Sequence, residues 1–123
     1  MYKFISITGF LLLLSFAGCE RLEFATEVPY CIQKLARSIR RDEVRNPPAM
    51  IVEWRLTTGE KYYYVPPYCC DMFGELYDSE CNLICAPDGG ISGWGDGRCP
   101  SEILNSIEST KVIWKDDRGN DTP

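Results

Sequence analysis

The chain contains no histidine among its 123 residues. This absence excludes the Ser–His–Asp and Cys–His triads, because both need an imidazole as general base. The sequence also has no CxxC pair, whereas structural zinc sites use short paired cysteine spacings or mixed cysteine and histidine ligands. Neither a histidine-dependent hydrolase nor a zinc-stabilised fold fits this chain.

Apolar runs long enough to span a bilayer are also missing. The run at residues 10–17 is short, and a spanning helix needs about 20 residues. It follows Lys3 and precedes small residues and Cys19, which is the layout of a secretory signal. We therefore expect residues 1–18 to be a signal peptide that is removed from the mature chain.

The end of this signal reads SFAGC and resembles the lipobox of bacterial lipoproteins. Ala17, Gly18 and Cys19 fit that pattern, while Phe16 stands where leucine is usual. The resemblance implies that Cys19 carries a diacylglyceryl thioether and an acyl chain such as palmitate, and each buried methylene contributes about 0.8 kcal/mol. Residues 19–28 would be the lipidated tether, and the protein would be lipid-anchored in the bacterial cell envelope, most simply at the outer membrane. The alternative is a plain signal peptide that leaves Cys19 as an ordinary thiol.

Positive charge is in the minority. Without Lys3, 12 basic and 18 acidic side chains remain, a formal net charge of −6. Such a domain repels phosphate backbones, so nucleic acid is not an expected partner. The charge also repels anionic lipid surfaces, which favours attachment through a tether over attachment through a protein face.

Cysteine, by contrast, is abundant. Once Cys19 is set aside for the lipid, six of the seven cysteines remain: Cys31, Cys69, Cys70, Cys81, Cys85 and Cys99. An exported chain of this size with six cysteines predicts three disulfides, for which 15 connectivities exist.

Some of these pairings are favoured over others. A bond between neighbours is strained, so Cys69 and Cys70 are expected to point apart and to take different partners. A Cys85–Cys99 bond would close the glycine-rich segment between them and contribute about 3 kcal/mol through loop closure. Cys81 would then pair with one of the two adjacent cysteines, and Cys31 with the other.

Hydrophobic patterning predicts one main helix at residues 29–46. Its apolar positions fall on one face, at Ile32, Leu35, Ala36 and Ile39. The same segment carries the basic cluster Arg37, Arg40 and Arg41, followed by Asp42 and Glu43. A solvated helix face is the more ordinary explanation of this cluster than a binding patch.

The rest of the chain alternates as short strands do. Residues 50–56 and 61–65 predict a β-hairpin with Tyr62 and Tyr64 on one face and Tyr63 on the other, either packed or forming a carbohydrate platform. Residues 73–78 and 82–87 predict a second hairpin. Residues 100–110 predict a short helix capped by Ser101, and residues 111–115 a last strand. The expected fold is α+β, with one helix packed on an antiparallel sheet of four to five strands. It is stapled by disulfides, spans residues 29–118, and is followed by a polar tail at 119–123.

The segment CAPDGGISGWGDGRCP at residues 85–100 concentrates five glycines and two aspartates between two cysteines. It lacks the lysine of a phosphate-binding loop and the aspartate pattern of an EF-hand. Asp88 and Asp96, with Asp71 or Asp78, would be ligands of a looser calcium site, which needs 6 to 8 oxygens. Alternatively, Trp94 anchors a partner from an exposed recognition loop.

The plainest interpretation of this segment is a stapled structural loop that also serves as a contact surface. Its glycines supply positive φ angles, and Trp94 is expected to fold back onto the domain. The residues proposed for contact are Asp88, Gly89, Gly90, Trp94 and Asp96. We expect no cofactor and no metal.

One spaced pattern in this region is specific. It consists of Leu76-Tyr77-Asp78, then Cys85, Pro87, Gly89-Gly90, Gly93, Gly95-Asp96-Gly97 and Cys99-Pro100. With it, the chain resembles a family of small bacterial exported domains, domain of unknown function 6970, common in lipoproteins of the Bacteroidota type. The resemblance covers about residues 30–118 and implies export, a lipoprotein and a small domain, but no activity. Family members often carry another residue at the position of Cys81, which implies an optional disulfide there.

Three classes of function remain open. The sequence favours a non-enzymatic, membrane-anchored binding or structural module of the envelope, with an envelope protein or a glycan as partner. The first alternative is an inhibitor that presents its disulfide-held loop to a hydrolase. The second is a small carboxylate-dependent glycosidase using Glu75 and Glu80, or Asp71 and Asp78. A domain this small rarely builds the cleft that such an enzyme needs.

Overall fold

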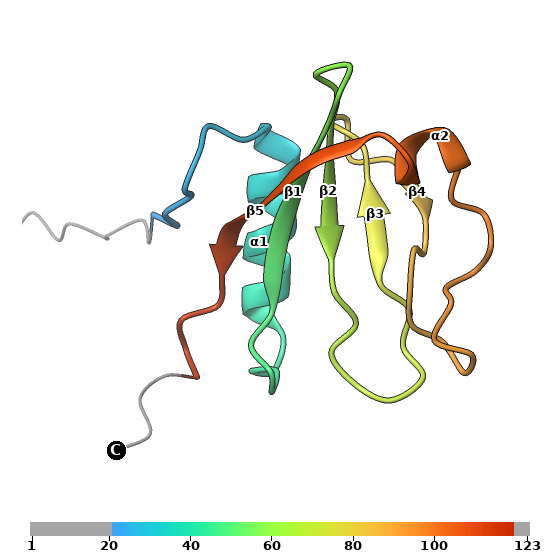
Figure 1. The fold of residues 1–123 in the computed structure, drawn as a ribbon. Helices are drawn as coiled ribbons and strands as arrows, with labels where there is room; N and C mark the ends of the chain where they lie inside the picture. Colours follow the sequence, from blue (N-terminus) through green and yellow to red (C-terminus); the bar gives the residue numbers. More distant parts are fainter. Residues whose placement is uncertain (1–20, 120–123) are drawn as a thin grey trace, which may run out of the picture.

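The computed structural model describes residues 21–119, in which one long helix lies against a twisted five-stranded antiparallel sheet (Figure 1). In chain order the elements are α1 (Tyr30–Arg41), β1 (Met50–Leu56), β2 (Lys61–Val65), β3 (Glu75–Tyr77), β4 (Leu83–Cys85), α2 (Ser101–Leu104) and β5 (Ile107–Lys115). This confirms the α+β fold expected from the sequence. Within residues 21–119, no helix is long and apolar enough to cross a membrane.

Helix α1 buries the apolar face that its periodicity predicts. Ile32, Ala36 and Ile39 are buried, and Leu35 packs beside them. The helix ends at Arg41 rather than at residue 46, because the residues that follow Ile39 are charged or exposed and add no buried contact. Tertiary packing of an apolar face supplies most of the stability of a helix in a protein. The backbone of Asp42 is extended instead, and its N–H donates to the Ile39 carbonyl.

The sheet has the order β4-β3-β2-β1-β5, so each hairpin predicted from the sequence is present. Tyr63 is buried under α1 with Ile51. Tyr64 points to the opposite face, where its ring centroid lies 5.0 Å from that of Trp54. The expected alternation of the tyrosines is confirmed, and these tyrosines pack against the two cores of the domain.

The C-terminal elements differ from the expectation. Helix α2 covers only Ser101–Leu104, and Pro100 rather than Ser101 occupies its N-cap position. Strand β5 begins at Ile107, four residues before the expected strand at 111–115. Ile107 pairs with Leu56 and packs in the second hydrophobic core, which is formed by Leu56, Leu76, Cys85 and Ile103. The chain after Leu104 therefore pairs with β1 instead of continuing the helix.

The residues before α1 lie against the domain at the β5 edge. Leu22 and Phe24 pack against the core that contains buried Val28. The N–H of Ala25 donates to the carbonyl of Ile113 at 2.9 Å. Within the segment expected as a tether at 19–28, the described residues are therefore docked, while Cys19 lies outside the described residues.

A buried ion pair follows β5 at the same edge of the domain. Asp116 is 1% exposed and lies 2.6 Å from Nη2 of Arg118. The hydrogen bond from Arg118 is the main reason why the pKa of Asp116 is lowered. Nη1 of Arg118 also donates to the carbonyl of Asp42 at 3.0 Å. The pair thereby joins the end of β5 to the end of α1.

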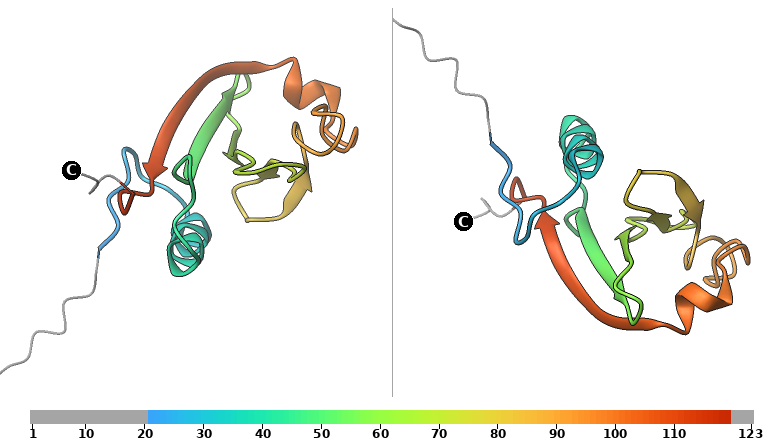
Figure 2. Two further views of the ribbon diagram at one scale, coloured as in Figure 1. Left: turned by 90° about the horizontal axis from the view of Figure 1, so that it is seen from below. Right: turned by 90° about the horizontal axis from the view of Figure 1, so that it is seen from above.

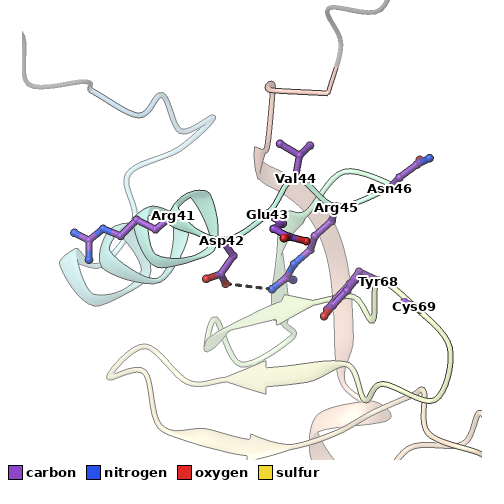
Figure 3. A pocket seen from close by; sticks show the side chains of 8 residues that line it. All are labelled: Arg41, Asp42, Glu43, Val44, Arg45, Asn46, Tyr68 and Cys69. Carbon is purple, nitrogen blue, oxygen red and sulfur yellow. Dashed lines mark ion pairs between the residues drawn. The ribbon is translucent and has the colours of Figure 1, made fainter.

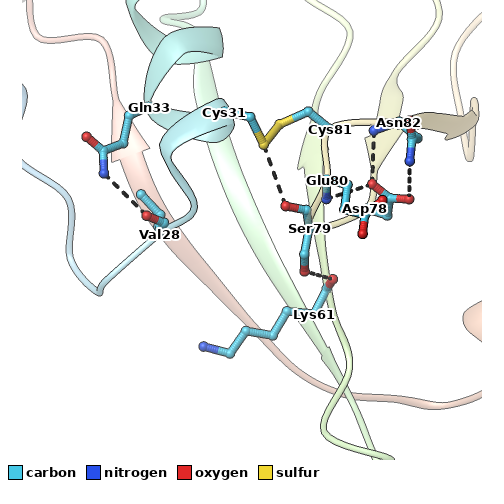
Figure 4. The surroundings of a disulfide bond; sticks show 9 residues. All are labelled: Val28, Cys31, Gln33, Lys61, Asp78, Ser79, Glu80, Cys81 and Asn82. Carbon is cyan, nitrogen blue, oxygen red and sulfur yellow. Dashed lines mark hydrogen bonds between the residues drawn. A yellow bond between two sulfur atoms is a disulfide. The ribbon is translucent and has the colours of Figure 1, made fainter.

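All six cysteines expected in disulfides form them, but only one favoured pairing is correct. Cys85 bonds to Cys99 as expected. Cys69 and Cys70 bond to each other, so the expectation that they take different partners is wrong. The third bond joins Cys31 to Cys81 (Figure 4).

Two local features explain this connectivity. The turn between β3 and β4 brings Cys81 against the first turn of α1, with 6.0 Å between the Cα atoms of Cys31 and Cys81. This leaves the adjacent cysteines with only each other. Cys70 adopts a left-handed backbone with a φ of 57° in the exposed loop between β2 and β3.

Candidate functional site

The glycine-rich segment forms a closed loop at the β4 edge of the sheet. We call residues 85–99 the contact loop. The Cys85–Cys99 bond closes it with a Cα separation of 5.1 Å. Two hydrogen bonds join it to residues 72–74: Gly90 N–H donates to Met72 O at 3.1 Å, and Gly74 N–H donates to Asp88 O at 3.0 Å. Covalent closure and these contacts give the loop one defined backbone path.

Two glycines of this loop have no room for a side chain. Gly89 has a φ of 79°, and an added Cβ would lie 2.3 Å from the carbonyl oxygen of Met72. Gly95 has a φ of 76°, and an added Cβ would lie 2.1 Å from the carbonyl oxygen of Ala86. The positive φ angles expected for this segment are confirmed, and close backbone approach is a second reason for glycine at these positions.

Asp88 faces the sheet rather than a partner. Its Oδ2 accepts a hydrogen bond from the Tyr64 hydroxyl. Its Oδ1 is buried and has no hydrogen-bond partner among the described residues, in the space that Gly74 leaves free. Burial raises the pKa of Tyr64, and the hydrogen bond to Asp88 raises it further. Asp88 therefore fixes the loop on β2.

Trp94 does not fold back onto the domain, and that expectation is wrong. Its side chain is 86% exposed, and that of Ile91 is 92% exposed. The second core is already filled by other apolar residues, among them Leu76, Cys85 and Ile103. The backbone of Trp94 forms a bridge to Gly89, so the chain is held while the indole projects away.

Two further apolar residues lie beside this loop. Met72 and Phe73 are about half exposed, and the Phe73 ring packs over Gly90, where an added Cβ would lie 2.5 Å from Cε1. We call Met72, Phe73, Ile91 and Trp94 the apolar tip. Three of the four, Met72, Phe73 and Ile91, were not predicted from the sequence as contact residues. The signal for Ile91 was an apolar residue in a segment of turn-forming residues.

The remaining contact residue, Asp96, serves the loop itself. Its Oδ1 accepts a hydrogen bond from the N–H of Arg98 at 2.9 Å. Both residues line a hollow of about 280 Å³ that also includes Phe73, Glu75 and Leu83. The lining is mixed apolar and charged, which suits contact with an amphipathic group.

Two of the four carboxylates proposed for glycosidase chemistry, Glu75 and Asp78, accept local hydrogen bonds. Glu75 accepts a hydrogen bond from the Tyr77 hydroxyl at 2.5 Å. Asp78 accepts backbone hydrogen bonds from Glu80 and Asn82, each at 2.9 Å. Burial alone would raise the pKa of Asp78, but hydrogen bonds from Asn82 and Glu80 lower it. Glu75 and Asp78 therefore act in local structure, Asp78 as the residue that shapes the β3–β4 turn.

The calcium interpretation lacks a set of ligands. Between residues 21 and 119, no three cysteine, aspartate or glutamate side chains are grouped so that they would hold a metal ion. Asp88 faces Tyr64, while Asp96 serves the backbone of Arg98. These two carboxylates therefore have separate structural roles.

A second hollow, of about 680 Å³, lies between the end of α1 and the loop after β2 (Figure 3). The guanidinium of Arg45 lies 4.3 Å from the centre of the Tyr68 ring and 4.0 Å from Oδ2 of Asp42. Cys69 lines the same hollow. Arg45 therefore already interacts with Tyr68 and Asp42 inside this hollow.

The contact loop and the segment that precedes α1 lie at opposite edges of the sheet. The loop leaves β4, and residues 22–25 pack beside β5. These are the two outer strands. Figure 2 shows the described N-terminal segment at one end of the molecule, with α2 and the contact loop at the other. The molecule thus has two distinct ends.

A family model described as Domain of unknown function (DUF6970) matches residues 37–116. The match includes every strand of the sheet and the whole contact loop. The comparisons with curated proteins and with solved structures find no match for the chain.

Proposed function

The chain belongs to the family of this domain of unknown function. Because that membership implies no activity, we propose a function from the N-terminal sequence and the geometry of the domain together. The protein is a lipid-anchored, non-enzymatic binding module of the bacterial cell envelope. It is attached to the membrane through Cys19 and contacts an envelope protein or a glycan through the apolar tip.

The observation that carries this proposal is the exposure of Ile91 and Trp94 on a closed loop. Scattered exposed apolar residues are ordinary on protein surfaces. Here four large ones belong to two segments that are hydrogen-bonded to each other. A loop that is already ordered loses little conformational entropy on binding, and tryptophan is enriched among residues that dominate binding energy.

The two ends of the sheet support the same function. The outer strands β4 and β5 are separated by four strand spacings, a distance of about 19 Å across the order β4-β3-β2-β1-β5. A lipid on Cys19 would hold the β5 edge near the bilayer. The apolar tip would then face away from the membrane, where a partner is accessible.

Site-specific photo-crosslinking in the native envelope tests the contact. A photoreactive phenylalanine analogue replaces Trp94 in one variant and Thr58, in the exposed β1–β2 turn, in the control. We expect an adduct of defined mass from position 94 and none from position 58. The adduct should disappear when Ile91 is also changed to Ser. Equal adducts from both positions, or none from either, would contradict a specific contact at the apolar tip.

An inhibitor is the second candidate, because a disulfide-closed loop with exposed apolar side chains is a shape that can occupy the cleft of a hydrolase. It is distinguished by function: the purified protein should inhibit a target hydrolase at stoichiometric concentration, and Trp94→Ala should weaken that inhibition. Lack of inhibition across envelope hydrolases leaves the binding module as the proposal.

A further inference from the structure

All charged side chains of helix α1 are basic, although the protein as a whole is acidic. Between Tyr30 and Arg41 it carries Lys34, Arg37, Arg40 and Arg41 and no acidic residue. The mature chain as a whole has a formal charge of −6. Charge is therefore segregated, and the helix presents a local field opposite in sign to that of the molecule.

The arginines of α1 border a hollow beside the segment that precedes this helix. This hollow, of about 480 Å³, is lined by Leu22 and by four arginines, Arg37, Arg40, Arg41 and Arg118. An adjoining hollow adds Arg21 and Lys115, together with Glu23 and Asp117. Figure 3 shows Arg41 projecting from the end of α1, away from the Asp42–Arg45 pair.

Some of these arginines form ion pairs within the protein. Arg40 pairs with Asp117 at 3.0 Å, and Arg118 pairs with buried Asp116. Arg37 lies 6.0 Å from the centre of the Tyr30 ring. Among the described residues, no carboxylate forms an ion pair with Arg37 or Arg41.

These arginines lie close to the expected anchor. Leu22 is docked on the domain, and Cys19 precedes it by three residues. An extended chain covers at most about 3.6 Å per residue, so the two residues are within about 11 Å of each other. The Debye length at physiological salt is about 8 Å. The separation is thus at most about one and a half Debye lengths, so the arginines that line the hollow with Leu22 would experience part of the field of a membrane that holds a lipidated Cys19.

We propose that Arg21, Arg37, Arg41 and Lys115, the basic face, bind phosphate groups of anionic lipid headgroups in the leaflet that holds the anchor. Guanidinium groups match phosphate oxygens in bidentate geometry. The contact sets the orientation of the domain, with α1 on the bilayer and the apolar tip directed outward. This inference rests on the proposed anchoring at Cys19 and deepens it.

Arginine modification on the lipidated protein tests the contact directly. The mature chain is reconstituted into nanodiscs of phosphatidylcholine, or of phosphatidylcholine with phosphatidylglycerol, and treated with phenylglyoxal. We expect modification of Arg37 and Arg41 to be about fivefold slower in the anionic nanodiscs, and high salt to remove the difference. Arg98, in the contact loop, should react equally in both. Equal rates at Arg37 and Arg41, or equal slowing at Arg98, would overturn the proposal.

A second experiment separates this proposal from the anchoring itself. The full mature chain with Cys19→Ser is sedimented with vesicles of the same two compositions. We expect binding to the phosphatidylglycerol vesicles, reduced about 25-fold by Arg37→Gln with Arg41→Gln, because each basic side chain near an anionic leaflet strengthens binding about fivefold. The matched control, Arg55→Gln with Lys111→Gln, removes the same charge from exposed positions outside both the basic face and the contact loop and should keep binding. Equal loss in both double variants, or no preference for the anionic vesicles, would refute the basic face even if Cys19 proves to be lipidated.

Discussion

The hydroxyl of Tyr64 on β2 donates a hydrogen bond to the carboxylate of Asp88 in the contact loop. The two residues are 24 positions apart in the chain. Their contact fixes the loop on the sheet, and Gly74 leaves the space that the carboxylate occupies. The orientation of the apolar tip therefore depends on a polar contact beneath it.

Removal of the Tyr64 hydroxyl should destabilise the protein. Tyr64→Phe leaves the Asp88 carboxylate part-buried without its donor, and an unsatisfied buried group costs about 1–3 kcal/mol. Urea denaturation monitored by circular dichroism measures the loss. The control is Tyr62→Phe, because the Tyr62 hydroxyl bonds to exposed Glu60 at 3.2 Å; its effect should stay within about 0.5 kcal/mol. Equal effects of the two variants would show that the Tyr64–Asp88 contact does not fix the loop.

Gly95→Ala should be more harmful than Gly97→Ala. Both glycines have positive φ, so alanine costs about 1–2 kcal/mol at either position. Only at Gly95 would the new methyl group also meet a backbone oxygen, 2.1 Å away, while Gly97 faces open space. The free energies of unfolding of the two variants give the comparison. If Gly95→Ala proved no worse than Gly97→Ala, the loop path described here would be wrong.

The ion pair between Asp116 and Arg118 should make the free energy of unfolding depend on pH. The folded pKa of Asp116 is lowered, so its contribution is present above the unfolded value of about 3.9 and is lost as the pH falls through the folded pKa. Asp116→Asn removes a charged hydrogen-bond acceptor and should cost about 2 kcal/mol at neutral pH. The variant should also lose less stability than the parent protein when the pH is lowered.

Asp117→Asn provides the matched control for Asp116→Asn. Asp117 pairs with Arg40, but its side chain is 73% exposed, and exposed pairs contribute about 0–1 kcal/mol. Unfolding free energies at neutral and acidic pH distinguish the two positions. Equal losses would mean that burial of Asp116 does not determine the strength of its pairing.

Two of the disulfides should differ strongly in their effect on stability. The Cys31–Cys81 bond closes a separation of 50 residues, for which loop-closure entropy predicts about 4 kcal/mol. The Cys69–Cys70 bond closes a separation of one residue and constrains the unfolded chain little. Thermal unfolding of Cys31→Ala with Cys81→Ala, and of Cys69→Ser with Cys70→Ser, should show a large loss in the first variant and a small one in the second. The reverse order would contradict the connectivity.

Periodicity predicted those parts of the fold whose cause is local. Alternation in residues 61–65 placed Tyr63 and Tyr64 on opposite faces, and the spacing of Ile32, Ala36 and Ile39 predicted the buried face of α1. The end of α1 and the start of β5 were mispredicted. They depend on which partners lie nearby in space, such as Leu56 opposite Ile107.

The candidate site was harder to predict than the fold. The sequence pointed to the contact loop and to Trp94, but not to the exposure of that side chain. Exposure depends on whether the core has room, and the second core is filled by residues such as Leu76 and Ile103 from other parts of the chain. The pairing of Cys69 with Cys70 likewise follows from Cys81 already being bonded to Cys31.

The most direct test of the central claim, an anchored and disulfide-stapled module, is the intact mass of the protein extracted from the membrane. It is measured with and without reduction, each followed by alkylation. The account predicts a lipid-sized addition on Cys19 and six thiols that are alkylated only after reduction, because the six other cysteines form three bonds. An unlipidated chain would contradict the anchor, and thiols that are alkylated without reduction would contradict the stapled fold.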